Sequence, residues 1–243
     1  MKISIIIIAS NNEDTIYECL NSVQQFDEVI VYLNNSQDNT KNIAQKFSNV
    51  KIIDGYFDGF GATKNRAVSC SSNDWVFVLD SDEFFTQELV NELKYLKLEE
   101  NSCYKVNRKN LFLKEEVKYS GWNPDWVVRL FNKKQTQFSD VEVHESIITD
   151  KLDVKTLNNR IVHYAINDIR DFLLKTYKYS NLQRNKNKVY NPFIIFNKAL
   201  FAFIRTYILK LGFLDGYKGL IISIGNFNGV FFKYMVNYVK AKK

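Results

Sequence analysis

The chain has 243 residues, of which 46% are hydrophobic and 15% aromatic, and it carries a formal net charge of +6. This composition supplies enough apolar side chains for a packed core and excludes a disordered or low-complexity protein. The three cysteines are odd in number and form no CxxC pair, which excludes a disulfide framework and favours a reducing cytoplasm.

The first half of the chain alternates short apolar strands with helices. Residues 3–8 form a continuous β-branched run, typical of a strand that is buried on both faces, rather than an export signal. Further strands are expected at residues 28–33, 50–53 and 75–79, and a helix is expected near residues 62–70. This alternation predicts a parallel, doubly wound α/β sheet, which binds ligands at the carboxyl ends of its strands.

The second half follows a different pattern. A helix is expected over residues 87–98. Strand-like stretches follow at residues 103–113, 126–132, 144–150 and 160–166, which we expect to add to the sheet as antiparallel strands. From residue 167 onward the chain is mainly helical and increasingly basic, although no uninterrupted apolar run of about 18 residues indicates a membrane span.

Three carboxylates end the fourth strand, in the stretch "DWVFVLDSDEFF". Asp80, Asp82 and Glu83 would raise one another's pKa unless a cation compensates their charge. Oxygen ligands suit Mg²⁺ or Mn²⁺, which usually leave further coordination positions to substrate phosphates, so the pattern indicates a diphosphate substrate. The alternative is a solvated turn or a helix N-terminus, where acidic residues are also favoured.

Four ordered motifs carry a family resemblance: "SIIIIASNNEDTIYECLNSV", "NNSQDNT", "GFGATKNRA" and "DWVFVLDSDE". They resemble the inverting family 2 glycosyltransferases with a GT-A fold. The stretches "WNPDWVVRLFNK", "VHE", "HYAINDIRDFLLKTYKYSN" and "YILKLGFLDGYKGL" resemble the WaaE-like glucosyltransferases, which elongate the inner core of lipopolysaccharide or lipooligosaccharide. The resemblance thus covers nearly the whole chain.

The resemblance implies a GT-A catalytic domain over residues 1–166, with a mixed, mostly parallel sheet flanked by helices. Its nucleotide-sugar half would be residues 1–100 and its acceptor half residues 101–166. Residues 167–243 would form a helical extension, basic and apolar, that associates with a membrane.

The resemblance also implies a nucleotide-sugar site. Its residues would be Ala9, Asn11, Glu13, Asn35, Asp38, Lys64, Arg66, Asp80 and Ser81. The family commonly has an acidic residue where this chain has Asn34 or Asn35, and an amide can still pair with a uracil edge. Asp38 could equally cap the following helix, and the glycines of "GFGATKNRA" could simply form a turn.

Asp82 is the expected ligand of Mn²⁺ or Mg²⁺, and Asp80 is expected to contact the ribose or a metal-bound water. For His163 a metal or phosphate role and a core role remain open. Inverting transfer also needs a general base. Glu145 in the "VHES" stretch is preferred over Glu83, although Glu145 could also be an ordinary exposed carboxylate.

Acceptor binding is expected at Trp122, Asp125, Arg129 and His144, because aromatic faces stack on sugars and an arginine can hold an acidic sugar. These side chains could also serve packing. The basic segment 184–243 is interleaved with aliphatic runs, which favours the anionic surface of the inner membrane over nucleic acid. The alternative is a helix buried against the catalytic domain.

These patterns together predict a metal-dependent hexosyltransferase at the cytoplasmic face of the inner membrane. It would transfer a hexose, with glucose as the family expectation, from a nucleotide sugar, with UDP as its carrier, to a lipid-anchored oligosaccharide. Homo-oligomer formation is left open. Two rivals are a sugar nucleotidylyltransferase and a membrane-bound scaffold without turnover. A nucleotidylyltransferase would normally have a glycine-rich first loop, where this chain has "ASNNED".

Overall fold

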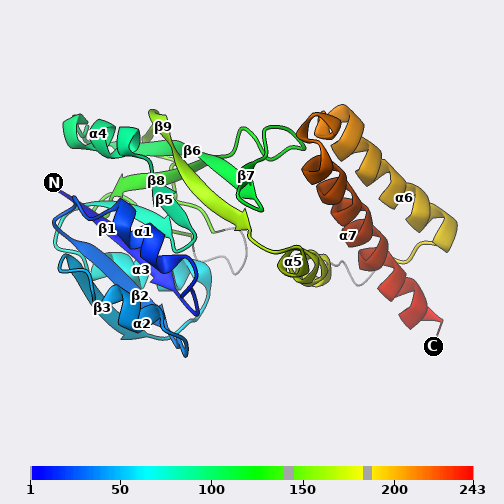
Figure 1. The fold of residues 1–243 in the computed structure, drawn as a ribbon, viewed down its shortest axis with the longest axis horizontal. Helices are drawn as coiled ribbons and strands as arrows, with labels where there is room; N and C mark the ends of the chain where they lie inside the picture. The colour runs from blue at the N-terminus through cyan, green and yellow to red at the C-terminus, as the bar shows by residue number, and fades with distance from the viewer. Residues whose placement is uncertain (1, 140–144, 183–187, 243) are drawn as a thin grey trace. The chain divides into compact units, whose positions relative to one another are not determined.

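The structure is a computed structural model that describes residues 2–139, 145–182 and 188–242 (Figure 1). The chain divides into two compact units. The first comprises Met1–Arg108 and Asp125–His163, and the second comprises Lys109–Pro124 and Tyr164–Lys243. Each unit therefore contains segments that are distant in sequence.

One sheet runs through the described part of the chain, in the order β3-β2-β1-β4-β8-β6-β9-β5, with β7 pairing to β6. Its strands are β1 (Ile3–Ala9), β2 (Val29–Asn34), β3 (Val50–Gly55), β4 (Trp75–Asp80), β5 (Glu83–Phe85), β6 (Ser102–Phe112), β7 (Glu115–Glu116), β8 (Trp126–Asn132) and β9 (Asp153–Ile166). The pairs β1–β2, β1–β4 and β2–β3 are parallel, which confirms the doubly wound half of the prediction.

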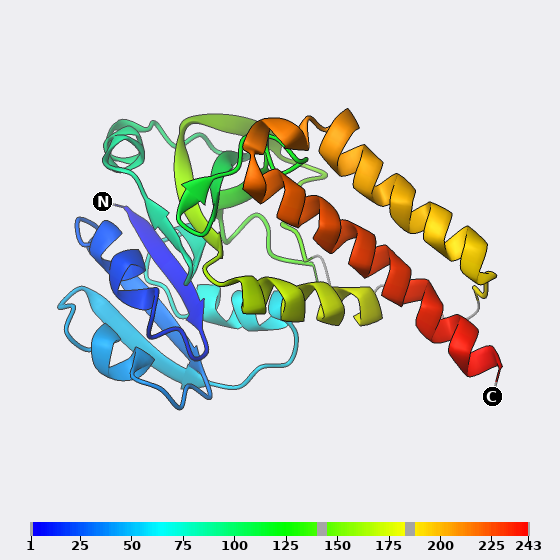
Figure 2. The same cartoon turned by 45° about the vertical axis from the view of Figure 1, so that its right-hand side comes forward.

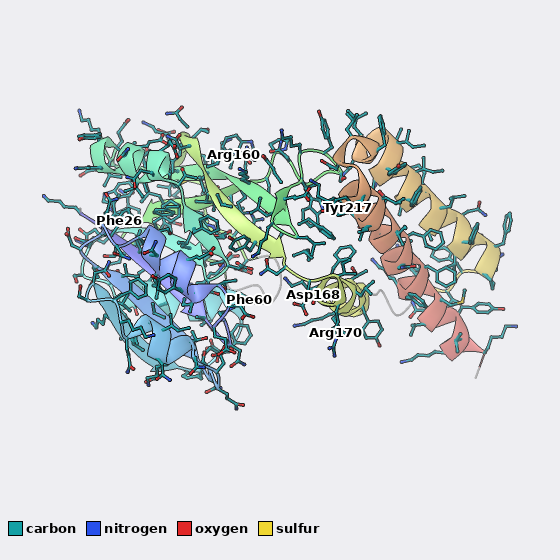
Figure 3. The ribbon with its side chains drawn as sticks, in the orientation of Figure 1. Phe26, Phe60, Arg160, Asp168, Arg170 and Tyr217 are labelled. Atoms are coloured by element: carbon teal, nitrogen blue, oxygen red, sulfur yellow. The ribbon has the colours of Figure 1, made fainter. Side chains whose placement is uncertain are left out.

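Helices cover both faces of the parallel strands (Figure 1). In the first unit these are α1 (Ile16–Ser22), α2 (Thr40–Ala44), α3 (Phe60–Ser69) and α4 (Gln87–Tyr95). Side chains of β1 alternate between the faces: Ile5 and Ile7 pack with α1, α2 and α4, whereas Ile6 packs with α3. Phe26, labelled in Figure 3, belongs to the first of these cores and packs edge-on against Phe85.

The antiparallel additions to the sheet are confirmed, except for one predicted strand. β8 pairs antiparallel with β4 and β6, and β5 pairs antiparallel with β9. Residues 145–150 form no strand, and a single bridge joins Phe138 to Ile147. Local bonds such as Ser139 N to Ser146 O (2.9 Å) hold this segment, a pairing too short to make a strand. The strand prediction for residues 144–150 was therefore wrong within the described residues.

The second unit is mainly helical, as predicted for the end of the chain. Its helices are α5 (Ile169–Leu182), α6 (Pro192–Ile204), the π-helical η1 (Arg205–Leu209), the 3₁₀ turn η2 (Gly212–Asp215) and α7 (Tyr217–Ala241). α6 and α7 lie side by side as a helical hairpin (Figure 2). A small core of Phe112, Val117, Ile166, Phe172 and Ile222 holds the unit together.

Two glycines in α7 allow neighbouring segments to approach its backbone to different degrees. A Cβ atom on Gly219 would lie 1.8 Å from the carbonyl oxygen of Gly212 in η2. A Cβ on Gly229 would lie 3.4 Å from its nearest neighbour, a methyl group of Thr176 in α5. Only at Gly219 does the backbone of another segment occupy the space that a side chain needs.

We therefore expect opposite effects from the same substitution in one helix. Gly219→Ala should lower the free energy of unfolding by about 1–3 kcal/mol through overpacking. Gly229→Ala should leave it unchanged or raise it by up to about 1 kcal/mol, because alanine favours the helix. Denaturant unfolding of both variants measures the difference. Equal stabilities would show that α7 and η2 are not in close contact.

Candidate active site

The candidate site lies where the order of the parallel strands reverses. β1 lies between β2 and β4, and Ile8 is paired in register with Asp80 at the carboxyl ends of β1 and β4. α1 and α3, which follow β1 and β3, cover opposite faces of the sheet. Open α/β sheets bind ligands in the crevice that such a reversal creates. Asp80, Asp82 and Glu83, at the carboxyl end of β4, therefore stand at the expected position.

The loops after β1 and β2 are joined by reciprocal hydrogen bonds. The side-chain oxygen of Asn11 accepts from Gln37 N (2.8 Å), and the carboxylate of Glu13 accepts from Asn39 N (3.0 Å). In return the carboxylate of Asp38 accepts from Glu13 N (3.0 Å). The polar atoms of Asn11, Glu13 and Asp38 thus hold the rim of the crevice in shape.

The other predicted residues of these loops differ in exposure. Ala9 and Ser81 are buried, and Asn35 is exposed with a left-handed backbone (φ 50°). The side-chain oxygen of Asn34 is enclosed and accepts no hydrogen bond. Buried acceptors are usually satisfied, so this oxygen is a candidate for contact with a bound ligand.

Arg129, from β8, neutralises two of the three carboxylates. Its Nη2 atom lies 2.5 Å from Asp80 Oδ2 and 2.7 and 2.8 Å from the two oxygens of Glu83. Glu83 is completely buried and also accepts a bond from Asp80 N (3.0 Å). Buried carboxylates are costly without a partner, so Arg129 makes this acidic strand end compatible with a folded core.

Lys64, in α3, joins the same carboxylates to Glu145. Its Nζ atom lies 3.3 Å from Asp80 Oδ1 and 2.9 Å from Glu145 Oε1. Asn65 joins α3 to Phe138, because its side-chain amide exchanges two hydrogen bonds with the backbone of Phe138 (2.8 and 3.0 Å). The "GFGATKNRA" motif therefore positions Glu145 over the end of β4.

Arg108, in β6, extends the cluster on its other side. Its guanidinium lies 2.8 Å from Asp125 and 3.4 Å from Glu83. The ion pairs form one alternating chain whose members are Asp125, Arg108, Glu83, Arg129, Asp80, Lys64 and Glu145. Four carboxylates and three cations therefore alternate along this chain of ion pairs.

The field of this cluster affects the groups around it. Burial would raise the pKa of Asp80, but the charges and hydrogen bonds of Arg129 and Lys64 hold it well below its ordinary value. Burial, together with the negative charges of Glu83, Asp82 and Asp80, raises the pKa of the Cys19 thiol well above its ordinary value. Cys19 is therefore a protonated core residue rather than a nucleophile.

Asp82 lies outside the chain of ion pairs and faces His163. Glu83 pairs in register with His163 in β9, which brings His163 Nε2 to 3.6 Å from Asp82 Oδ2. Both side chains are partly exposed, at 32% for Asp82 and 18% for His163. Among the described residues no group of three or more His, Cys, Asp and Glu could hold a metal, so this pair would supply two ligands at most.

The profile of "Glycosyl transferase family 2" matches residues 4–156, which include β1, the carboxylates after β4 and Glu145. The chain belongs to this family. It is a glycosyltransferase.

Relatives and solved structures agree with this assignment. An "Uncharacterized glycosyltransferase" of Rickettsia typhi is 29% identical over 240 residues, covering 92% of this chain and 82% of the relative. The WfaP protein of Escherichia coli, named "UDP-Glc:alpha-D-GlcNAc-diphosphoundecaprenol beta-1,3-glucosyltransferase", is 30% identical over 105 residues, covering 40% of this chain and 42% of WfaP.

A crystal structure of the S. aureus TarS fragment 1–349 aligns with a TM-score of 0.50 at 16% identity, covering 97% of this chain and 92% of that chain. TarS has also been solved in complex with UDP. The likeness shows the fold, and the predicted GT-A architecture is confirmed.

The described members of the predicted acceptor site of the glycosyltransferase are divided between the two units. Asp125 and Arg129 belong to the first unit and take part in the chain of ion pairs. Trp122 belongs to the second unit, where it packs against Phe112 with ring centroids 6.1 Å apart. His144 lies outside the described residues. Acceptor binding by these four residues stays a prediction.

Arg66, predicted to bind the nucleotide, is also held by the protein itself. It pairs with Asp58, donates to Tyr32 Oη (3.1 Å), and its guanidinium lies 4.1 Å from the ring centroid of Tyr56. Sequence reasoning missed Arg108 entirely. The available signal was a cation inside a strand-like stretch, which needs a buried counter-charge somewhere in the fold.

Removing the charge of Arg129 should destabilise the glycosyltransferase. We expect Arg129→Met to lower the free energy of unfolding by about 3–5 kcal/mol, because Glu83 would stay fully buried without its closest cation. The double variant Arg129→Met with Glu83→Gln should recover part of this loss, since one of the stranded charges is gone. Urea unfolding of both single variants and the double variant measures this coupling. Strict additivity would contradict the pairing.

Proposed function

We propose that this glycosyltransferase moves a hexose from a UDP-sugar to a lipid-anchored core oligosaccharide with inversion at the anomeric carbon. The observation that carries the proposal is that the three carboxylates at the end of β4 have different partners. Asp80 and Glu83 are neutralised by Arg129 and Lys64, whereas Asp82 stays outside these pairs beside His163. One carboxylate is thereby reserved for a ligand.

A UDP-sugar donor has support from the site and from relatives. WfaP is named for UDP-Glc, and TarS was solved with UDP. The enclosed oxygen of Asn34 at the end of β2 is a hydrogen-bond acceptor, and the uracil N3–H is a donor of the matching kind. Asn11, Glu13, Asn35 and Asp38 shape the rim that would receive the nucleotide. Ala9, Ser81, Lys64 and Arg66 would complete the donor site.

Asp82 and His163 fit a divalent cation. Two ligands that each lie about 2.1 Å from one ion are at most about 4.2 Å apart, and their nearest atoms are 3.6 Å apart. Mn²⁺ accepts both imidazole and carboxylate, and Mg²⁺ also takes few protein ligands beside substrate phosphates. When bound, the metal would stabilise negative charge on the departing nucleoside diphosphate.

The residues of the chain itself have three tasks in the reaction. Glu145 takes the proton from the acceptor hydroxyl as that oxygen attacks the anomeric carbon opposite the leaving group. Lys64 orients the carboxylate of Glu145 through its 2.9 Å contact. Glu83 is a weaker candidate for the base, because it is fully buried and both of its oxygens bind Arg129. Asp80 holds the ammonium group of Lys64 through a second ion pair (3.3 Å).

The acceptor and location are proposed from the resemblance and the second unit. The WaaE-like motifs favour a lipopolysaccharide or lipooligosaccharide core acceptor, and WfaP is named for a lipid-diphosphate acceptor. Such acceptors are anchored in a membrane. The basic, apolar segment 184–243 would bind the cytoplasmic face of the inner membrane, with residues 1–166 as the catalytic domain and 167–243 as the membrane-associating extension. Glucose and homo-oligomer formation stay predictions.

Asp82 should be required for metal-dependent donor use. We expect Asp82→Asn to weaken Mn²⁺ binding in an electron paramagnetic resonance titration with UDP, and to lower UDP-glucose hydrolysis about 100-fold or more. Asp74→Asn is the matched control, since Asp74 precedes the amino end of β4, opposite to the candidate site, and pairs with Lys134 (2.7 Å). Unchanged Mn²⁺ binding in Asp82→Asn would exclude Asp82 as a ligand. Failure of the wild-type protein to bind any nucleotide sugar would favour the scaffold alternative.

Glu145 should be needed for transfer but not for donor binding. We expect Glu145→Gln to lower the rate of glucosyl transfer about 10²–10⁴-fold, since amides do not accept the proton. Affinity for UDP should change little. Glu88→Gln, an exposed carboxylate in the first turn of α4, is the control. A rate within a few-fold of wild type would show that the base is another group.

A further inference from the structure

The outer surface of α6 is apolar. α6 packs mainly against α7 and buries Ile195, Ala199 and Ala202. Large apolar side chains on its remaining circumference are exposed: Phe193, Ile194, Phe196, Leu200 and Phe201. The stretches Pro192–Leu209 and Tyr217–Ala241 are long and apolar enough to cross a membrane, yet only 22% of the 18-residue apolar window in each is buried. A core helix of a soluble protein would be mostly buried, so this surface needs an apolar cover.

The charges of the hairpin identify the chemistry of that cover. The basic residues from position 188 to 242 are Lys188, Lys198, Arg205, Lys210, Lys218, Lys233, Lys240 and Lys242. The single acid in this range is Asp215, which is buried and accepts several hydrogen bonds. A symmetric contact with a second copy would place these like charges together. An anionic phospholipid surface offers both an apolar layer and the opposite charge.

The turn of the hairpin is tied to the polar segment Lys109–Pro124 of the same unit. Asp215 accepts hydrogen bonds from Lys118 N (2.9 Å) and Ser120 Oγ (2.7 Å). Tyr217, labelled in Figure 3 at the start of α7, donates to Glu115 (2.9 Å). The turn of the helical hairpin is therefore fixed to the charged segment Lys109–Pro124, and the two must lie at the same depth relative to a membrane.

The middle of α7 is connected to the same polar segment through α5. Phe172 and Thr176 of α5 lie against Gly225 and Gly229 in the middle of α7. α5 follows β9 directly, and Leu113 N donates to Ile166 O at the end of β9 (2.7 Å). The turn and the middle of α7 are thus both fixed to one polar body.

A spanning hairpin would conflict with these ties. An 18-residue helix is about 27 Å long and would have to cross about 30 Å of hydrocarbon. Its turn would then carry Glu115, Lys118 and Lys210 to the far side of the membrane, and α5 would enter the hydrocarbon. Burying such polar groups in lipid is costly.

We infer that α6 and α7 lie parallel to the membrane plane in the headgroup region of an anionic bilayer and do not span it. This inference rests on the proposed membrane association and adds its geometry. α6 supplies the apolar contact, and Lys198 and Arg205, seven positions apart on one helical stripe, lie beside anionic headgroups. The active site would thereby be held at the membrane surface where a lipid-anchored acceptor is presented.

Spin-label depth measurements test the orientation. Phe193→Cys, Leu200→Cys and Ile208→Cys place labels along one exposed side of α6 and η1, spaced over about 22 Å of helix. The labels are introduced into the 243-residue Cys70→Ser protein, in which the remaining Cys19 and Cys103 are buried. Power saturation is recorded on vesicles of phosphatidylcholine with 30% phosphatidylglycerol. We expect the three labels to lie at the same shallow depth. A label at Leu200 near the bilayer centre, with shallow labels at Phe193 and Ile208, would overturn the inference in favour of a spanning helix.

Vesicle partitioning supplies the control for the charge. Lys198→Gln with Arg205→Gln should weaken partitioning about 30-fold, whereas Lys46→Gln in the first unit should not change it. Labels that stay exposed to water in the presence of vesicles would overturn the inference. Labels that are shielded in the absence of vesicles, in a protein whose mass in solution is that of a dimer, would also overturn it and would identify a second copy as the cover. UDP-glucose hydrolysis measured without vesicles reports on the glycosyltransferase separately, so failure of membrane binding is distinguishable from failure of the proposed function.

Discussion

The structure of the site depends on the burial of Arg129 between Asp80 and Glu83. Glu83 is inaccessible to water and Arg129 nearly so, and unpaired charges at such positions would be strongly unfavourable. Arg129 comes from β8, an antiparallel strand, and its partners come from the end of β4 and the start of β5. The ion pair therefore joins the parallel half of the sheet to its antiparallel addition by charge as well as by backbone pairing.

This pairing also decides which acidic group remains for chemistry. Two of the three adjacent carboxylates are consumed by cations of the protein, and the third, Asp82, lies beside His163 across the β5–β9 pair. Lys64 spans from Asp80 to Glu145 and so places the proposed base over the same strand end. The spacing of these functional groups thus follows from a structural network of charges.

In the second unit, a buried carboxylate and a close backbone contact fix the helical hairpin. Asp215 fixes the turn of the helical hairpin through backbone and hydroxyl donors, and the close approach at Gly219 keeps η2 against α7. Hydrogen bonds to Asp215 hold the hairpin's turn, and Phe172 and Thr176 of α5 pack against the middle of α7. The outer face of α6 stays apolar. A surface that combines exposed apolar side chains with basic residues suits a lipid headgroup layer better than a hydrocarbon interior.

The sequence by itself determined the alternation of strands and helices, the position of Asp80, Asp82 and Glu83 at a strand end, and the family. These are encoded in short-range periods and ordered motifs, which can be read without knowing what packs against what. The strand prediction for residues 144–150 failed over the described residues 145–150, where a β-like composition finds one bridging partner within the described part of the chain. Only the tertiary structure decided the partner of each charge. Arg129 meets Asp80 across 49 positions and Lys64 meets Glu145 across 81, and no local pattern specifies contacts at such separations.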